Sequence, residues 1–269
     1  MNIYGLLGKK LGHSLSPEIH KLIFEKLNVN GIYNLYEVSE NNIKDVVDKV
    51  KDFNIKGLNV TIPYKIKVMD YMDEVSKEAK KIGAINTIVL KNNKMIGYNT
   101  DYYGFGMMLK KFKVEVKDKI VVVLGSGGAS KAVVQYLKDK GSKKIIIVTR
   151  NIKEAQCKFK NCEFITYNDL KNVTNSEIIV NCTPIGMYPN VDNSIVEENI
   201  LKNFKVSVDL IYNPLETLFL KKSKKVGNTS VNGLYMLVGQ AIKAQELWNN
   251  IKFDEEIIDE IYDKLVEII

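Results

Sequence analysis

The chain has 269 residues, 45% of them hydrophobic and 26% charged, which is typical of a globular protein with a substantial core. This length accommodates one large domain or two ordinary ones. No stretch is long and apolar enough to span a bilayer, and the N-terminus lacks a secretory signal pattern. We therefore expect a cytoplasmic protein without a membrane segment.

The net charge of +7 raises the question of a nucleic-acid partner. The basic residues, however, are spread along the chain, and the densest run, 221–225, is typical of the solvated end of a helix. We expect no nucleic-acid binding, although a basic field would attract anionic small molecules.

The cysteines and histidines predict no metal site. Cys157, Cys162 and Cys182 show no C-x-x-C spacing, and only His13 and His20 could join them. We expect reduced thiols, as in most intracellular proteins.

Strand and helix patterns alternate through the first part of the chain. The loop 8–17 contains Ser14 and Ser16, two hydroxyls that could bind a carboxylate. Ser16 followed by Pro17 also predicts a helix N-cap with proline at the first helical position. The elements expected in this part of the chain are a strand at 2–7, a helix after Ser16, a strand at 32–38 and a helix at 43–53.

A further strand pattern covers 57–65 and runs into Pro63. Asn59 and Thr61 are two residues apart, so both side chains are expected on one face of this strand. Lys65 follows at its end, where functional side chains of α/β sheets gather. A single lysine is most often a surface residue, so a catalytic role needs a partner.

The next segment can supply that partner. A short helix is expected around 76–82, and two strands around Asn92-Asn93 predict a hairpin. The hairpin would bring Asn86 towards Thr100 and Asp101 at the start of the next helix. Taken alone, Thr100 would be a helix cap, and Asp101 would complement the helix dipole.

Residues 119–150 form the most informative stretch. A buried strand at 120–124 is followed by a glycine turn, a helix that ends at Gly141 and a second strand at 145–148, which predicts a βαβ unit. Gly125 permits the tight bend, and Gly127 lets the backbone approach a pyrophosphate at the helix N-terminus. Ser130 takes the place of the third glycine of the strict fingerprint.

The residues after the second strand favour NADP over NAD. NAD-binding units usually place Asp or Glu there. Here Thr149 and Arg150 occupy the position, Lys153 follows, and the first carboxylate is Glu154. An arginine pairs with a 2′-phosphate that a carboxylate would repel.

The rest of the chain continues the α/β pattern, with strands expected at 177–181 and 206–210. A long helix is expected from about Gly233 to Trp248, and a final amphipathic helix contains Ile257 to Ile268. Gln240, on the long helix, offers both a donor and an acceptor to a polyol.

A series of short blocks in this order carries a family resemblance: the Ser14/Ser16 loop, 59–65, 83–87, 97–101, 125–129, 181–187, 209–217 and 232–241. Together they resemble the shikimate dehydrogenase family over nearly the whole chain. The resemblance implies a substrate-binding α/β domain at 1–101 and a Rossmann-type, doubly wound NADP-binding domain at 102–236. The C-terminal helices, 237–269, would pack back on the first domain.

The resemblance also implies the reaction, reversible NADPH-dependent reduction of 3-dehydroshikimate to shikimate in aromatic amino acid biosynthesis. Lys65 and Asp101 would be the catalytic pair, and Lys65 would either transfer the proton or only stabilise the alkoxide. The implied substrate-binding residues are Ser14, Ser16, Asn59, Thr61, Lys65, Asn86, Asp101, Tyr212 and Gln240. The implied cofactor-binding residues are Gly125, Ser126, Gly127, Gly128, Ala129, Thr149, Arg150, Lys153, Thr183, Ile211, Gly233 and Met236.

Two positions depart from the family's usual pattern. Tyr64 stands where His or Phe is frequent, which indicates packing more than chemistry. Glu154 stands where a second arginine is frequent, so the NADP preference depends on Arg150, with Lys153 beside it.

Two alternatives stay open. One is a quinate/shikimate dehydrogenase of broader specificity that also uses NAD, and the other is a non-catalytic NADP-binding sensor on the same fold. The presence of Lys65, Asp101 and the polar substrate set favours the enzyme. The sequence leaves open whether the protein is a monomer or a homodimer.

Overall fold

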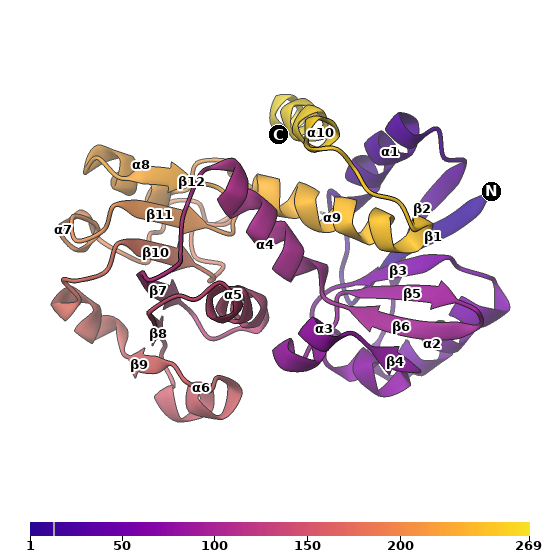
Figure 1. Cartoon of the computed structure of the whole chain (residues 1–269), viewed down its shortest axis with the longest axis horizontal. Helices are drawn as coiled ribbons and strands as arrows, with labels where there is room; N and C mark the ends of the chain where they lie inside the picture. The colour runs from indigo at the N-terminus through magenta and orange to yellow at the C-terminus, as the bar shows by residue number, and fades with distance from the viewer. Residues whose placement is uncertain (13) are drawn as a thin grey trace. The chain divides into compact units, whose positions relative to one another are not determined.

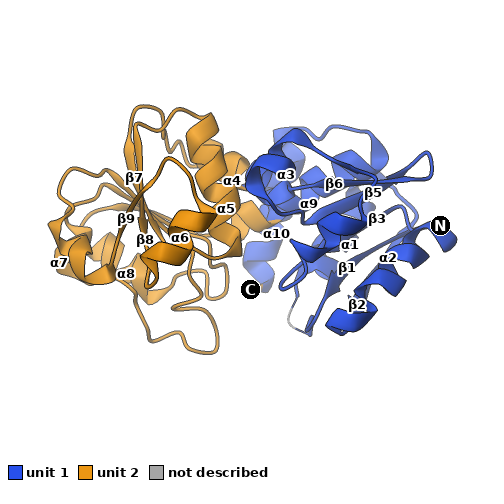
Figure 2. Cartoon of the chain, turned by 90° about the horizontal axis from the view of Figure 1, so that it is seen from below, with its two compact units in different colours: residues 1–104, 238–268 blue, residues 105–237, 269 orange. Residues whose placement is uncertain are grey.

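The computed structural model describes residues 1–12 and 14–269, so His13 lies outside the described residues. The chain divides into two compact units, coloured separately in Figure 2. The first contains residues 1–104 and 238–268, and the second contains 105–237 with Ile269. The predicted α/β class is confirmed. Residues 238–268, which contain most of the C-terminal helices, are grouped with the first unit.

The first unit contains a six-stranded mixed sheet with the order β2-β1-β3-β5-β6-β4 (Figure 1). β1 pairs in parallel with β2 and β3, whereas β5 runs antiparallel to β3 and β6. The register sets Asn59 opposite Thr87. The strands are β1 (Asn2–Gly8), β2 (Gly31–Glu37), β3 (Gly57–Val60), β4 (Glu74–Val75), β5 (Thr87–Lys91) and β6 (Lys94–Tyr98).

The predicted hairpin is confirmed as β5–β6. Asn92 and Asn93 connect its strands and have φ angles of 50° and 60°. Asparagine tolerates this left-handed backbone better than most residues, which explains why two of them occupy a tight turn between antiparallel strands.

Helices cover the first sheet and supply apolar faces to its core. Ile19, Ile23, Val47 and Val50 are buried residues at helical spacing, and Trp248 on the C-terminal side is also buried. The helical elements of this unit are α1 (Ser16–Leu27), η1 (Glu40–Asn42), α2 (Ile43–Asp52), η2 (Lys67–Tyr71), α3 (Lys77–Ile82), the last part of α9 (Leu234–Asn249) and α10 (Glu255–Ile268).

The second unit contains a six-stranded sheet with the order β12-β11-β10-β7-β8-β9, and all its strand pairs are parallel among the described residues (Figure 1). From β7 the chain proceeds outwards through β8, and later it resumes on the other side of β7 at β10. The carboxyl ends of β7 and β10 therefore border the topological switch point, where α/β sheets bind ligands. The strands are β7 (Ile120–Leu124), β8 (Lys144–Val148), β9 (Glu163–Ile165), β10 (Ile178–Asn181), β11 (Val206–Asp209) and β12 (Thr229–Val231).

The central strands of this sheet are apolar at almost every position because both of their faces are covered. Val121 to Leu124 are 0% exposed, and Ile179 and Val208 are too. The helical elements are α4 (Thr100–Lys111), which begins in the first unit, α5 (Gly128–Asp139), α6 (Ile152–Lys158), η3 (Tyr167–Asn172), α7 (Glu198–Leu201), α8 (Leu218–Lys225) and the start of α9.

The predicted capping role of Ser16 is wrong. The N-cap of α1 is Leu15, and Ser16 is already the first residue of the helix, with no side-chain cap bond. Instead, the Ser14 Oγ accepts a hydrogen bond from the Ser16 N–H at 3.2 Å. One serine earlier in the loop therefore satisfies a backbone donor at the start of the helix.

The predicted strand 57–65 is too long. β3 ends at Val60, although the Thr61 N–H still donates to the Leu7 carbonyl at 2.9 Å. Pro63 has no N–H to donate to a ladder, so the chain turns at 62–66 before it reaches Lys65. Thr61 therefore lies beyond the strand that holds Asn59.

Within residues 1–12 and 14–269, no helix has the length and apolar character needed to cross a membrane. The same residues contain no cluster of three His, Cys, Asp or Glu side chains arranged to hold a metal ion.

Candidate active site

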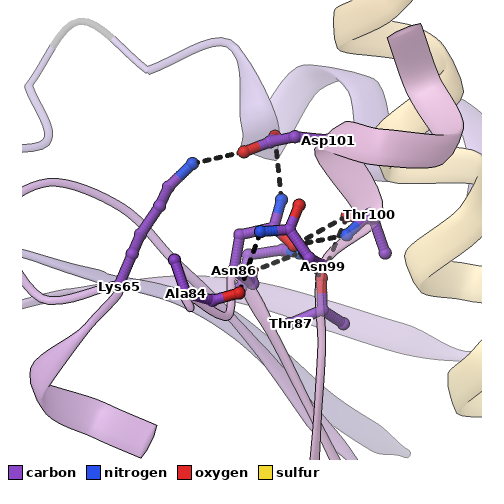
Figure 3. A network of polar contacts seen from close by, with 8 residues as sticks. Lys65, Ala84, Asn86, Thr87, Asn99, Thr100 and Asp101 are labelled. Carbon is purple, nitrogen blue, oxygen red and sulfur yellow. Dashed lines mark hydrogen bonds and ion pairs between the residues drawn. The ribbon is translucent and has the colours of Figure 1, made fainter. Parts of the chain in front are cut away.

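Lys65 and Asp101 form an ion pair in the first unit (Figure 3). The Lys65 Nζ lies 2.6 Å from the Asp101 Oδ2, and the two side chains are 22% and 16% exposed. A charge-assisted hydrogen bond of this length, largely shielded from water, holds the ammonium in one place. The pair nevertheless keeps enough exposure to meet a ligand.

Asn86 holds the other oxygen of the carboxylate. Its Nδ2 donates to the Asp101 Oδ1 at 2.9 Å, while its Oδ1 accepts the Thr100 N–H at 2.6 Å. Asn86 thus joins the carboxylate to the first backbone N–H of α4. Because helix N-termini carry a partial positive charge, this end of α4 also favours the negative charge of Asp101.

The backbone explains why these side chains meet. The Asn86 N–H donates to the Tyr98 carbonyl on β6, and the Asn86 carbonyl accepts from the Val60 N–H at the end of β3. The Lys65 carbonyl accepts from the Ile85 N–H at 2.9 Å. Three segments that are separate in sequence are therefore tied together around Asn86.

Asn59 extends the network onto β3. Its Nδ2 donates to the Thr87 Oγ1 at 3.1 Å, and its Oδ1 accepts from the Tyr33 hydroxyl at 2.8 Å. Asn59 is 4% exposed, so both ends of its amide are engaged inside the protein. Burial raises the pKa of Tyr33, while the Ser16 side chain acts in the opposite direction. Tyr33 is therefore a neutral phenol between Ser16 and Asn59.

His20, on α1, packs against Tyr33, on β2. The two rings stack with centroids 4.1 Å apart, and the Gln245 Nε2 lies 2.8 Å from the His20 Nδ1. His20 is 0% exposed, and desolvation lowers its pKa to about 3, with the Asn59 side chain acting in the opposite direction. The imidazole is therefore neutral. Because the Gln245 Oε1 accepts from the Asn249 Nδ2 at 2.8 Å, its Nε2 is free to donate to the ring.

The other predicted substrate residues have different surroundings. Thr61 is half-buried and directly precedes the turn 62–66 that contains Lys65. Gln240 on α9 is 9% exposed. Tyr212 belongs to the second unit, where burial raises its pKa. Tyr64 is 1% exposed and donates to the Val38 carbonyl at 2.6 Å, which confirms that it packs in the core.

The glycine turn of the second unit follows β7 and opens α5. Gly125 has a φ of +96°, and a Cβ there would lie 2.8 Å from the Thr183 Cγ2. At Gly127 and Gly128 a Cβ would meet no atom within 4 Å, and Gly127 has an ordinary φ of −82°. The protein itself therefore requires glycine at 125 but not at 127 or 128. A bound pyrophosphate against the backbone would require it there.

Ser130 fills the position of the missing third glycine. It is 0% exposed, and its hydroxyl donates to the Gly127 carbonyl at 2.7 Å. A small buried side chain thus permits close packing of α5 and also fastens the turn. Ser126 is likewise engaged, with its Oγ 2.9 Å from the Thr149 Oγ1.

The residues after β8 leave a basic, exposed surface. Thr149 is 3% exposed, whereas Arg150 and Lys153 are exposed. Glu154, the first carboxylate, forms an ion pair with Lys158 one helical turn later. Its backbone N–H is capped by the Asn151 Oδ1 at 3.2 Å. These contacts engage Glu154 in α6 itself.

A buried carboxylate organises the ends of β10 and β11. Asp209 is 0% exposed and accepts from the Asn181 Nδ2 at 3.0 Å, from the Thr217 hydroxyl at 2.7 Å and from the Ile211 N–H at 3.1 Å. Burial raises its pKa to about 6, against the effect of these hydrogen bonds. Asn181 in turn accepts from the Thr183 N–H and hydroxyl, so this network fixes Thr183.

The remaining predicted cofactor residues are mostly buried. Ile211 and Met236 are 5% and 8% exposed. At Gly233 a Cβ would lie 2.1 Å from the Leu210 carbonyl oxygen, so packing alone requires glycine there.

The chain matches two family models, which cover most of its length. Residues 6–88 match the shikimate dehydrogenase substrate binding domain, and residues 107–212 match the shikimate / quinate 5-dehydrogenase model. A shikimate dehydrogenase (NADP(+)) of Clostridium perfringens is 49% identical over 267 residues, which cover 98% of each chain. The chain belongs to the shikimate dehydrogenase family.

Solved structures of the family agree with the fold. A crystal structure of a chorismate mutase/shikimate 5-dehydrogenase fusion protein from Clostridium acetobutylicum matches with a TM-score of 0.98 and 52% identity, covering 100% of this chain and 98% of that one. A shikimate 5-dehydrogenase from Thermus thermophilus, solved with NADP(H) and shikimate, matches with a TM-score of 0.89 and 28% identity, covering 98% and 99% of the chains.

The sequence does not indicate several buried polar side chains that make contacts in each unit. Thr87 belongs to a block that carries the resemblance, but the sequence assigns no role to it, nor to Tyr33 and Gln245. In the second unit, it assigns none to Asp209. The sequence indicates His20 only as a candidate metal ligand. A buried polar residue inside an apolar pattern was the available signal at these positions, but its partners lie far away in sequence.

Proposed function

We propose that this protein catalyses the reversible, NADPH-dependent reduction of 3-dehydroshikimate to shikimate in aromatic amino acid biosynthesis. The observation that carries the proposal is the Lys65–Asp101 ion pair, with Nζ and Oδ2 2.6 Å apart, in a chain of the shikimate dehydrogenase family. We further propose that the protein is cytoplasmic and is either a monomer or a homodimer. Sedimentation equilibrium would distinguish the two oligomeric states.

Lys65 acts on the oxygen of the reacting carbon. When bound, NADPH supplies the hydride, so negative charge develops on the substrate's carbonyl oxygen. The Lys65 ammonium donates a hydrogen bond to this oxygen and either transfers a proton or stabilises the charge. Asp101 holds the ammonium in position through its Oδ2, and Asn86 holds Asp101 through its Oδ1.

The substrate's other groups are bound by the polar residues of the same family site. Ser14, in the loop before α1, and Ser16, the first residue of α1, bind the carboxylate. Thr61, Asn86 and Gln240 bind ring hydroxyls, and Tyr212 lines the pocket. Asn59 supports the substrate site indirectly, because it is nearly fully buried and its amide is hydrogen-bonded to Tyr33 and Thr87.

The second unit holds the cofactor. The turn from Gly125 to Ala129 binds the pyrophosphate, because the first N–H groups of a helix have no acceptor within it and a Cβ at Gly127 or Gly128 would meet no atom within 4 Å. Thr149, Arg150 and Lys153 bind the adenosine end, and Arg150 pairs with the 2′-phosphate. Thr183, Ile211, Gly233 and Met236 lie along the ribose and nicotinamide.

Initial rates in a two-by-two design test the proposal. Purified protein is given shikimate or quinate, each with NADP or NAD, and formation of the reduced cofactor is followed. We expect strong activity only with shikimate and NADP. Comparable activity with quinate or NAD would make the protein a broader quinate/shikimate dehydrogenase. Folded protein that binds NADP but shows no activity in any combination would refute the enzyme and favour a sensor.

A further inference from the structure

Thr87 is a buried hydroxyl in the centre of the site's polar network, but it has no route to a ligand. It is the first residue of β5 and is 0% exposed. The register pairs it with Asn59 on β3 and with Tyr98 on β6, so strands on both sides hold its backbone. Any effect of Thr87 on the reaction must therefore pass through its neighbours.

The orientation of the Asn86 amide follows from its partners. Its Oδ1 lies 2.6 Å from the Thr100 N–H, a group that can only donate, and its Nδ2 lies 2.9 Å from the Asp101 carboxylate, which can only accept (Figure 3). Only one amide orientation satisfies both. A single hydrogen bond to Oδ1, however, leaves the amide plane able to rotate, so a second donor matters.

The Thr100 hydroxyl is one such donor, and the Thr87 hydroxyl is another. The Thr87 Oγ1 lies 3.1 Å from the Asn86 Oδ1 and 3.0 Å from the Thr100 Oγ1, which itself lies 3.1 Å from the same oxygen. Thr87 also accepts from the Asn59 Nδ2, whose donor role is set by its contact with the Asn86 carbonyl. Since Thr87 has one proton, it donates either to Asn86 directly or to Thr100, which then donates to Asn86. Both arrangements end on the Asn86 Oδ1.

We propose that Thr87 is a positioning residue of the catalytic site. Its hydroxyl joins Asn59 to Asn86, fixes the plane of the Asn86 amide, and thereby holds the Asp101 carboxylate against Lys65. The inference rests on the proposed function, because it assigns a purpose to the position of the Lys65–Asp101 pair. It adds a residue that touches neither substrate nor cofactor.

The test replaces the hydroxyl without changing the shape of the side chain. Thr87→Val removes the donor and acceptor and keeps the branched outline, whereas Thr87→Ser keeps the hydroxyl. We expect Thr87→Val to lower kcat about 10- to 100-fold, the loss typical of a slightly misplaced catalytic group, and Thr87→Ser to stay within about threefold of wild type. The KM for NADP should be unchanged in both, because the cofactor residues lie in the other unit.

Two controls separate positioning from general damage. Ile88→Val alters the next residue of the strand, which is also 0% exposed but has an apolar side chain, and it should leave kcat unchanged. The side-chain amide resonance of Asn86, assigned by comparison with Asn86→Asp, should move in Thr87→Val and stay in place in Thr87→Ser and Ile88→Val. Thr87→Ala replaces the valine variant if that variant does not fold.

An unmoved Asn86 resonance in Thr87→Val would overturn the inference, and so would an unchanged kcat. The resonance does not depend on turnover. If the wild-type protein fails to oxidise shikimate, the proposed function falls. The resonance alone then decides whether Thr87 positions Asn86.

Discussion

Lys65 is the side chain that would meet the developing charge in the proposed reaction. We expect Lys65→Ala to lower kcat for shikimate oxidation by about 10²- to 10⁴-fold, because it removes the only group of the ion pair that can donate a proton. The dissociation constant for shikimate should change little, since other residues bind its carboxylate and hydroxyls. Steady-state kinetics and calorimetric titration measure the two effects separately.

Lys67 offers a matched control for this substitution. It lies two residues further along, and it also forms an ion pair, with the Glu40 Oε1 at 3.2 Å, but both side chains of that pair are well exposed. Lys67→Ala should leave both kcat and shikimate binding at wild-type values, because exposed pairs contribute little. Near-normal turnover in Lys65→Ala would remove Lys65 from the mechanism.

The residues on the exposed side of the site were predictable from sequence, and those behind it were not. Asp101 lies beside Lys65 as predicted, and their catalytic roles stay predictions. The contacts of Thr87 and His20 are set by strand register and helix packing. His20 meets Gln245, 225 residues away in sequence, and no local pattern contains that information.

The turn between β7 and α5 separates the needs of the fold from the needs of the ligand. We expect Gly127→Ala to leave the melting temperature unchanged, because the new Cβ meets no atom within 4 Å and the φ of −82° suits alanine. The same Cβ would project from the backbone at the proposed position of the pyrophosphate. NADP affinity should fall by about tenfold or more, as measured by fluorescence titration, with thermal unfolding followed in parallel.

Gly125→Ala is the contrasting variant on the same turn. A Cβ at Gly125 would lie 2.8 Å from the Thr183 Cγ2, and its φ of +96° is unfavourable for alanine. This variant should lower the melting temperature as well as NADP binding. If Gly127→Ala bound NADP normally, the pyrophosphate could not lie against this turn.

Long apolar strands were predictable as elements, but short edge strands were not. β7, β8 and β10 are continuous apolar runs, and the sequence pattern predicts each of them within one residue of its observed bounds. β9 and β12 have three residues each and border the same sheet, and their sequences, Glu163–Ile165 and Thr229–Val231, are too short to show a period. Only the parallel neighbour inside the sheet makes them strands.

Across the whole molecule, each unit contains a buried group whose pKa is displaced within the acidic range, and the two displacements have opposite signs. In the first unit, burial lowers the pKa of His20 from 6.5 to about 3. In the second unit, burial raises the pKa of Asp209 from 3.8 to about 6. Burial favours the neutral form of both groups, so folding makes His20 harder to protonate and Asp209 easier to protonate.

The consequences for stability follow from proton binding in the folded and unfolded states. The contribution of neutral His20 to the free energy of unfolding is fully present above about pH 6.5 and is lost as the pH falls towards 3. The contribution of Asp209 is present below about pH 4 and is lost as the pH rises through 6. Three carboxylates of the second unit have lowered pKa values: Glu154, Asp169 and Glu177. They change the stability of this unit only at pH values below about 4.5.

Between about pH 4.5 and 6, the two units should therefore respond to pH in opposite directions. Amide hydrogen exchange, resolved by peptide, should show the first unit gaining protection as the pH rises, after correction for the intrinsic exchange rate. As the pH rises over the same interval, the free energy of unfolding of the second unit should fall by up to roughly 2 kcal/mol, given the size of the shift in the Asp209 pKa. Asp209→Asn keeps the shape of the side chain without its titration and should abolish the loss in the second unit alone. Two results would show that these buried groups do not govern the response to pH. One is protection that changes with pH in the same direction in both units, and the other is a loss of protection in the second unit that persists in Asp209→Asn.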